Sequence, residues 1–306
     1  MARVKIKWAG GTDIGLTRKN NEDSFAVSGD LSSSEWSQPQ DRSFRRLSEL
    51  GALLIVADGM GGYNAGEVAS SIAVRAIQDY FLPEQASKVI HDDLSVLDFM
   101  KAAVSQANAS ILDHARNHPE TSGMGTTVVM AWILGQKVYV CWCGDSRCYV
   151  LNKRNGLLQL SKDHSYVQEL VDKGQLSPEQ MHDHPLSNVI TRCLGDQYLA
   201  QPETNIYHAA DGDVIMLCSD GLCGFCDDDL ILATMRRSGH DPQTCREELI
   251  SAALSCGGYD NVTVAVANIV IGRKSHTSFW ERLWALSRSH RLFLVQTCTR
   301  GRRAIG

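Results

Sequence analysis

Four aspartates stand directly beside the most apolar strand-length runs of the chain, and this arrangement restricts the fold more than any other feature. Runs of Val, Ile, Leu and Ala between turn residues are typical of buried strands. If such strands belong to one stack of sheets, their ends converge and the carboxylates gather in one place. The aspartates are Asp58 after residues 52–57, Asp145 after 138–144, Asp220 after 214–219, and Asp260 before 262–267.

Carboxylates gathered in this way favour a metal site. Like charges raise one another's pKa unless cations neutralise them, and hard oxygen ligands select Mg²⁺ or Mn²⁺. The glycines of Asp58-Gly59-Met60-Gly61-Gly62 would let backbone carbonyls approach an ion. At any single position the alternative is that Asp and Gly mark the turn after a strand. Four such positions together favour the metal site.

The order of the expected elements predicts the fold class. Strands, two helices, more strands, two helices and a last strand do not follow the alternation of a parallel sheet, so we expect an α+β fold of mostly antiparallel sheets covered by helix pairs. Residues 31–50 are expected to form a solvated loop. The expected strands are 4–8, 24–27, 52–57, 126–134, 137–143, 148–152, 157–160, 214–218 and 262–271, and the expected helices are 68–80, 93–117, 227–237 and 245–255.

The charge is unevenly distributed. The chain of 306 residues has a formal net charge of -5 and a pI of about 6.1, which argues against a nucleic-acid partner. Eight Lys and Arg residues against one Glu give residues 273–306 a charge of +7, which leaves -12 on residues 1–272. An acidic body suits a protein that gathers cations.

The start of the chain and its apolar runs predict the cellular location of the protein and the redox state of its cysteines. The start, Met1 to Lys7, lacks the apolar run of a secretory signal. The longest apolar runs, such as 52–57 and 128–134, are too short to span a bilayer. We therefore expect a cytoplasmic protein whose ten cysteines are reduced.

Seven short motifs occur in a fixed order between about residue 10 and residue 270. They are Arg18-x-x-Asn21-Glu22-Asp23, Asp58-Gly59-Met60-Gly61-Gly62 with Ala65-Gly66-Glu67, Gly125-Thr126-Thr127, Gly144-Asp145-Ser146-Arg147, Asp163-His164-Ser165, Ser219-Asp220-Gly221-Leu222 and Asp260-Asn261-Val262-Thr263. This series resembles that of the PPM (type 2C) metal-dependent protein serine/threonine phosphatases, especially their bacterial branch. The resemblance implies a central β-sandwich flanked by helix pairs, in four layers, over residues 1–272. Residues 273–306 are then a basic amphipathic extension.

The resemblance also implies a role for individual residues. Two cations, Mn²⁺ or Mg²⁺, would be held by Asp58, the Gly59 carbonyl, Asp220 and Asp260, with Asp58 bridging them. Glu22 and Asp23 would hold the metal waters, Asp145 would contribute to a third, weaker metal site, and Arg18 would grip the substrate phosphate. Residues 165–195 resemble the flap of the bacterial branch and the strand after it.

The chemistry implied is hydrolysis of a phosphomonoester by a hydroxide that bridges two divalent cations. Eukaryotic relatives carry a histidine after the Asp-Gly pair as the proposed general acid, whereas this chain has Met60. Our hypothesis for the acid is a metal-bound water near Asp145. His164 is expected to be a hydrogen-bonding residue beside the flap.

The expected partners are phosphoserine and phosphothreonine proteins, among them a bacterial Ser/Thr kinase, with no nucleic acid. The tail, with Trp280 and Trp284 among arginines, is a candidate for contact with a membrane surface or a partner. Packing on its own domain is the alternative. Two other functions remain open: a pseudophosphatase that binds phosphoproteins without turnover, and a phosphatase for small molecules or an anti-sigma-type regulator.

Overall fold

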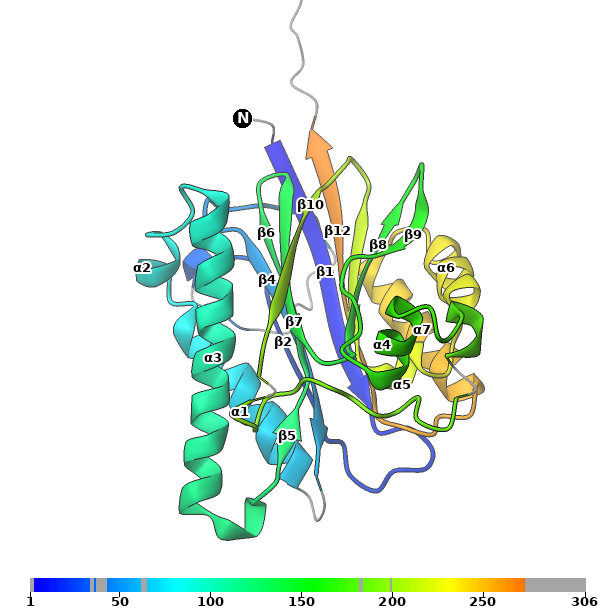
Figure 1. Cartoon of the computed structure of the whole chain (residues 1–306). Coiled ribbons are helices and arrows are strands. Elements are labelled where there is room, and N and C mark those ends of the chain that lie inside the picture. The colour runs from blue at the N-terminus through cyan, green and yellow to red at the C-terminus, as the bar shows by residue number, and fades with distance from the viewer. Residues whose placement is uncertain are drawn as a thin grey trace, which may run out of the picture. The chain divides into compact units, whose positions relative to one another are not determined.

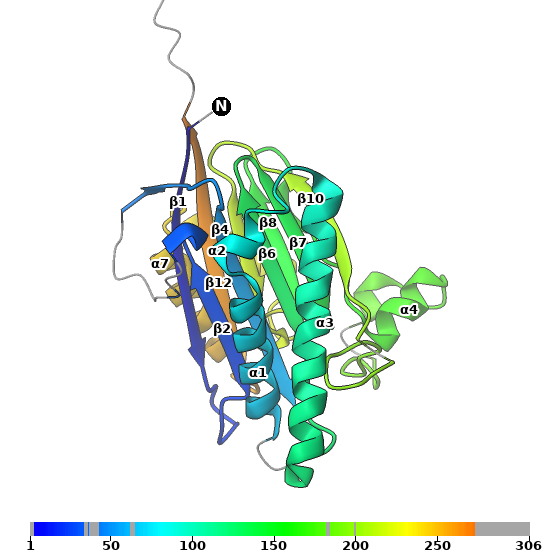
Figure 2. The same ribbon diagram turned by 90° about the vertical axis from the view of Figure 1, so that its left-hand side faces the viewer.

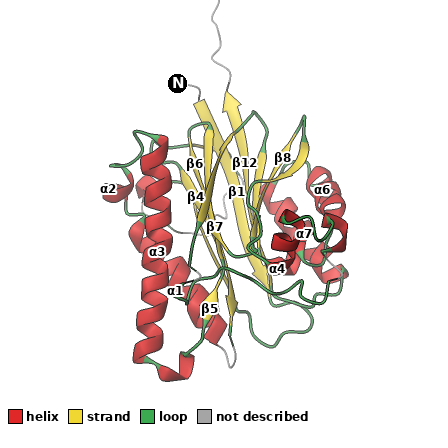
Figure 3. Cartoon of the chain, in the orientation of Figure 1, coloured by secondary structure: helices red, strands yellow, loops and turns green. Residues whose placement is uncertain are grey.

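The computed structural model describes residues 3–33, 36, 43–61, 65–181, 184–198 and 200–272. Residues 3–272 form one compact unit, in which two β-sheets stack face to face and helices cover both outer faces (Figures 1 and 3). The predicted α+β fold with layers in the order α, β, β, α is confirmed. Residues 273–306, with the predicted amphipathic helix, lie outside the described residues.

The first sheet has the order β3-β1-β12-β11-β8-β9, and every neighbouring pair is antiparallel. Its longest pair joins β1 to β12, from Arg3 opposite Gly272 to Asp13 opposite Val262. The loop after β1 therefore lies beside the loop before β12. The bounds are β1 Arg3–Asp13, β3 Arg45–Arg46, β8 Arg147–Asn152, β9 Gly156–Gln159, β11 Val214–Cys218 and β12 Val262–Gly272.

The second sheet has the antiparallel order β10-β7-β6-β4-β2, and the short strand β5 pairs with the end of β4. The break between β5 and β6 falls at Thr127, whose backbone N–H donates to the Asp58 carbonyl (2.8 Å). The bounds are β2 Asp23–Ser28, β4 Ala52–Met60, β5 Gly125–Thr126, β6 Val128–Leu134, β7 Lys137–Cys143 and β10 Glu203–His208.

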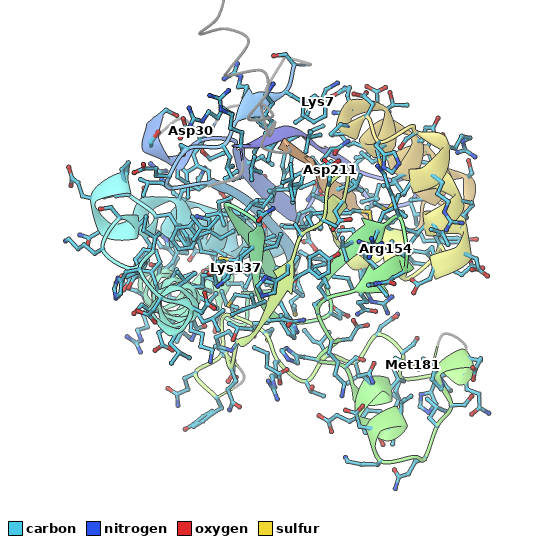
Figure 4. All side chains as sticks on the ribbon, turned by 90° about the horizontal axis from the view of Figure 1, so that it is seen from above. Lys7, Asp30, Lys137, Arg154, Met181 and Asp211 are labelled. Carbon is cyan, nitrogen blue, oxygen red and sulfur yellow. The ribbon has the colours of Figure 1, made fainter. Side chains whose placement is uncertain are left out.

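Helices α1 and α3 lie across the outer face of the second sheet (Figure 2), and α5, α6 and α7 cover the first. Segment 166–181, with α4 and Met181, projects from the body (Figure 4). In the described part of the chain, no helix has the length and apolarity needed to cross a membrane. The bounds are η1 Leu31–Ser33, α1 Ala65–Tyr80, α2 Pro83–Ala86, α3 Asp93–Asn117, η2 Pro119–Thr121, α4 Tyr166–Asp172, η3 Pro178–Gln180, α5 Asp220–Cys223, α6 Asp228–Arg237 and α7 Pro242–Ser255.

Three apolar layers hold the unit together, one between the sheets and one under each group of helices. Strand β4 shows why its sequence is uniformly apolar. Leu54 and Val56 face the other sheet, whereas Leu53 and Ile55 face α1 and α3, and all four are fully buried. A strand buried on both faces needs an unbroken apolar run.

Three expectations from the sequence were wrong. Strand β1 is not confined to residues 4–8 but continues through Gly10 and Gly11 to Asp13. The Phe25 ring packs over Gly10 and the Arg246 side chain over Gly11, where a Cβ would lie 2.5 Å from Phe25 Cε2 and 2.7 Å from Arg246 Cδ. Strand β10 was not predicted, since this polar edge strand is mostly half-buried. The segment 31–50 is not wholly solvated, since β3 and buried leucines lie within it.

Replacing Trp132 with alanine should lower the free energy of unfolding by about 3–5 kcal/mol. Trp132 is fully buried; its ring centroid lies 5.0 Å from that of Phe81 and 5.9 Å from that of Phe99, and its Nε1 donates to the Leu50 carbonyl (2.8 Å). Urea denaturation followed by circular dichroism measures the change. The control Leu94→Ala, at a side chain 73% exposed on α3, should shift the value by less than about 0.5 kcal/mol. Equal denaturation midpoints for all three proteins would contradict the prediction.

Candidate active site

The predicted aspartates meet where the two sheets approach each other. In β4, Leu54 and Val56 face the other sheet, so the alternation of the strand directs Asp58 the same way. Asp220 follows β11 and Asp260 precedes β12, and these neighbouring strands bring the two residues together from the opposite sheet. One detail differs from expectation: Asp58 lies inside β4, which continues for two further residues.

The contact between Asp58 and Asp220 joins the two sheets. Their carboxyls are close enough to share a hydrogen bond, and both are half-buried. Burial first, and then the charges of Asp220, Asp23 and Asp145, raise the pKa of Asp58 well above its usual value. Burial likewise raises the pKa of Asp220, with the Asp260 charge adding to the effect. Two carboxyls in this position cannot both be ionised without a counter-charge.

Asp23 lies opposite Asp58 in the β2–β4 pair and is buried. Its Oδ2 accepts a hydrogen bond from Ser219 Oγ (2.7 Å), and that hydroxyl accepts in turn from the Thr263 backbone N–H (3.0 Å). Burial raises the pKa of Asp23 to about 7, although hydrogen bonds from Thr263 and Ser219 oppose the rise. Its Oδ1 is buried and has no hydrogen-bond partner among the described residues.

Asp145 stands in the turn between β7 and β8. Burial, followed by the charges of Asp220 and Asp163, raises the pKa of Asp145 to about 8. The turn is held on both sides, since the Gly144 carbonyl accepts from the His164 backbone N–H (3.0 Å) and Ser146 Oγ lies 2.7 Å from Thr127 Oγ1. The carboxyl is therefore presented toward Asp220 by a rigid turn.

These residues fit divalent cations. The donors are all oxygens, and their carboxyls are partly or fully buried. Among the described residues, Asp23 Oδ1 has no hydrogen-bond partner, and a bound cation would compensate a buried oxygen of this kind. Among the residues that the structure describes, no group of three or more Asp, Glu, His or Cys side chains is arranged to hold one ion. An ion here would complete its coordination with backbone oxygen and water, which is usual for Mg²⁺.

The backbone of Gly59 packs so closely against two carbonyl groups that no residue with a Cβ would fit at this position. A Cβ at this position would lie 2.2 Å from the Gly66 carbonyl oxygen and 2.5 Å from that of Glu22. The Gly59 N–H donates to the Glu22 carbonyl (3.1 Å), which fixes the start of β2 and the start of α1 against the end of β4. Burial raises the pKa of the Glu22 carboxyl, which lies beside Gly66. The charges of Arg18, Asp260 and Glu67 also act on the pKa of Glu22, which places this carboxyl near the other acids.

Arg18, in the loop after β1, is paired with Asp260 through an ion pair of 2.6 Å between Nη2 and Oδ2. The arginine side chain is half exposed, at 50%, so the pair is accessible to solvent. Arg18 therefore already contacts one of the predicted metal ligands. A guanidinium in this position offers its remaining N–H donors to an incoming phosphate.

Asn261 is a structural centre of the site to which the sequence assigned no role. Its Oδ1 accepts from the Glu22 backbone N–H (2.8 Å), and its Nδ2 donates to the carbonyls of Ile14 and Asn20 (2.9 Å each). The side chain of this 4% exposed residue thus ties the loop that carries Arg18 to the start of β12. The only available signal was its place in the motif after Asp260.

His164 is a buried hydrogen-bonding residue, as its sequence position predicted. Its Nδ1 accepts from the Gly144 N–H (3.1 Å), and burial followed by the Arg192 charge lowers its pKa. Its neighbour Asp163 accepts a bidentate ion pair from Arg147 at 2.7–3.0 Å, and only 8% of the Asp163 side chain is exposed. This pair anchors the base of the projecting segment to β8.

Comparison with known proteins agrees with this geometry. The family described as Protein phosphatase 2C matches residues 32–254. The serine/threonine protein phosphatase PstP of Mycobacterium tuberculosis is 36% identical over 273 residues, which cover 88% of this chain and 46% of PstP. The chain thus spans about half the length of that relative.

A second relative and a solved structure extend the agreement. The serine/threonine phosphatase stp of Listeria monocytogenes is 32% identical over 253 residues, covering 83% of this chain and 92% of stp. A crystal structure of the catalytic domain of PstP in complex with two manganese ions superposes with a TM-score of 0.68 at 34% identity, covering 87% of this chain and 99% of that domain. The chain belongs to the protein phosphatase 2C family.

Proposed function

We propose that this chain hydrolyses phosphoserine and phosphothreonine in proteins, using two divalent cations, Mn²⁺ or Mg²⁺. The observation that carries the proposal is the Asp58–Asp220 contact between the two sheets, which is stable with both carboxyls ionised only when cations lie beside it. The similar PstP catalytic domain, whose structure contains two manganese ions, supports the same conclusion.

The ligand roles follow the predicted assignment. Asp58, Asp220, Asp260 and the Gly59 carbonyl would hold the two cations, Glu22 and Asp23 would hold the metal waters, and Asp145 would form part of a third site. When bound, the cations neutralise the phosphate charge and activate a water for in-line attack. The protein holds the carboxyl oxygens in fixed positions and keeps the surrounding groups partly shielded from solvent.

Arg18 binds the phosphate group of the substrate. Its guanidinium is held over the site by Asp260, so it is oriented before the substrate arrives. The planar guanidinium matches two phosphate oxygens at once, which a lysine cannot do.

The cysteines and the named relatives bear on the cellular context. The nine cysteines among the described residues form no disulfide, which agrees with a reducing cytoplasm. The named relatives are serine/threonine protein phosphatases, and we propose that a Ser/Thr kinase and its targets are the physiological substrates. Contact of residues 273–306 with a membrane surface stays a prediction.

Asp58→Asn should reduce Mn²⁺-dependent hydrolysis of p-nitrophenyl phosphate and of a phosphothreonine peptide by at least about 100-fold, because it removes the carboxylate shared by both ions. Chelator should abolish the activity of the unsubstituted chain. Asp98→Asn, at an exposed position of α3, is the matched control and should keep full activity. Retained metal-dependent turnover in folded Asp58→Asn would refute the proposal.

Arg18→Lys should lower kcat/KM for the phosphothreonine peptide by about tenfold and Arg18→Ala by about 100-fold, since hydrogen bonds to a charged group contribute about 1.5–3 kcal/mol. Steady-state kinetics at saturating Mn²⁺ measures both. Equal activities for the lysine and alanine variants would contradict bidentate binding of phosphate. Mn²⁺ affinity, measured by titration calorimetry, checks that the metal site is intact.

Without metal, the folded protein should become less stable as the pH rises. The pKa of Asp23, about 7, and that of Asp145, about 8, lie above their ordinary value of 3.8, so the folded state binds more protons than the unfolded state. The resulting stability is present below about pH 4 and is lost by about pH 8. Melting temperatures in chelator should therefore fall between about pH 5.5 and about pH 8.5, and Mn²⁺ should restore them. Asp145→Asn should reduce the fall; an equal fall in this variant would contradict the assignment.

A further inference from the structure

Three exposed apolar side chains belong to the segments that carry Arg18, Asp260 and Asp220. Leu16 is 70% exposed, Tyr259 58% and Phe225 37%. Leu16 stands two residues before Arg18, Tyr259 immediately before Asp260, and Phe225 five residues after Asp220. We call Leu16, Phe225 and Tyr259 the apolar rim.

A fixed backbone supports Leu16. Its N–H donates to the Gly258 carbonyl at 2.7 Å, and its side chain lies directly over Gly258, where a Cβ would be 2.8 Å from Leu16 Cγ. Gly258 has φ +54°, and Gly15 beside Leu16 has φ +78°. Because glycines on both sides make this approach possible, the exposed leucine is presented by close packing of two loops.

The two aromatic residues form the other part of the rim. The ring centroids of Phe225 and Tyr259 lie 5.5 Å apart with planes at 45°, a favourable aromatic contact. Tyr259 folds back over Gly257, at φ +120°, where a Cβ would lie 2.2 Å from Tyr259 Cε2. The Leu16 side chain thus lies over Gly258, and the Tyr259 ring lies over the neighbouring Gly257.

The place of the rim distinguishes it from other exposed apolar residues. Single exposed side chains such as Leu94 on α3 are common on protein surfaces and need no explanation. Here three residues from three separate segments are linked: Leu16 lies over Gly258, Tyr259 lies over Gly257, and the Phe225 ring contacts that of Tyr259. Leu16 and Arg18, two residues apart, have Cα atoms no more than about 7 Å apart. A substrate chain spans at most about 11 Å over three residues, so its side chains near the phosphoresidue reach the rim.

We propose that the apolar rim binds an apolar side chain located one to three residues from the phosphoserine or phosphothreonine of a substrate protein, and so selects substrates by their sequence. This inference rests on the proposed phosphatase function. Phosphate at Arg18 fixes the substrate in place, and burial of an apolar side chain against Leu16 and Tyr259 adds affinity that a phosphoresidue flanked by glycine lacks.

The test compares two phosphothreonine peptides, one with leucines and one with glycines in the three positions on each side. For the unsubstituted chain, kcat/KM should be higher with the leucine peptide. Leu16→Ser and Tyr259→Ser should each lower kcat/KM for that peptide by about tenfold, mainly through KM, and leave the glycine peptide unchanged. Tyr259→Phe should retain the preference because the ring remains. Leu94→Ser is the matched control, at an exposed position of α3, the helix that covers the second sheet (Figure 1).

The outcomes are distinguishable. An equal loss on both peptides would overturn the proposal, since the rim would then only support Arg18. Unchanged kcat/KM of the variants on both peptides would also overturn it. If, in addition, the variants abolished a dimer seen by sedimentation of the unsubstituted chain, the rim would be a contact between two copies of this chain. Absence of metal-dependent turnover in the unsubstituted chain would instead refute the phosphatase function. Calorimetry with the same peptides would then decide whether the rim binds the leucine peptide more tightly.

Discussion

Asp58 and Asp220 come from different sheets, and their carboxyls are close enough to share a hydrogen bond. This contact is unfavourable when both are ionised, so the fold has to hold it in place against repulsion. The apolar layer between the sheets does so, since the fully buried Leu54 and Val56 of β4 precede Asp58 on the same face. Cations remove the repulsion, and the binding of metal and the stability of the fold therefore depend on the same residues.

Polar side chains and glycines make this arrangement rigid. Ser219 joins Asp23 of one sheet to Thr263 of the other, and Asn261 ties the loop after β1 to the start of β12. Gly221 admits the Asn261 carbonyl, where a Cβ would lie 1.9 Å from the oxygen. Sub-ångström positioning of ligands of this kind needs supporting hydrogen bonds around them, and here those bonds cross between the sheets.

One short loop, residues 14–18, combines two functions. Arg18 contacts Asp260, and Leu16 rests on the Gly258 backbone. Gly15 between them packs so closely that a Cβ would lie 2.3 Å from the Asp260 carbonyl oxygen. The residues proposed to bind phosphate and to recognise neighbouring side chains thus stand in one short loop, Arg18 beside Asp260 and Leu16 on Gly258.

The sequence alone determined the strands and helices of the core and the residues of the acidic cluster, because buried strands need unbroken apolar runs and the motif order is specific. It could not show that Gly10 and Gly11 lie inside a strand, since that depends on Phe25 and Arg246 packing over them. Strand β10 was missed because its pairing with β7, and not its composition, makes it a strand. Only the tertiary structure decided the roles of Ser219 and Asn261, the pairing of Arg18 with Asp260 and the apolar rim. Each of these joins segments roughly 200 or more residues apart, a distance over which local sequence patterns carry no information.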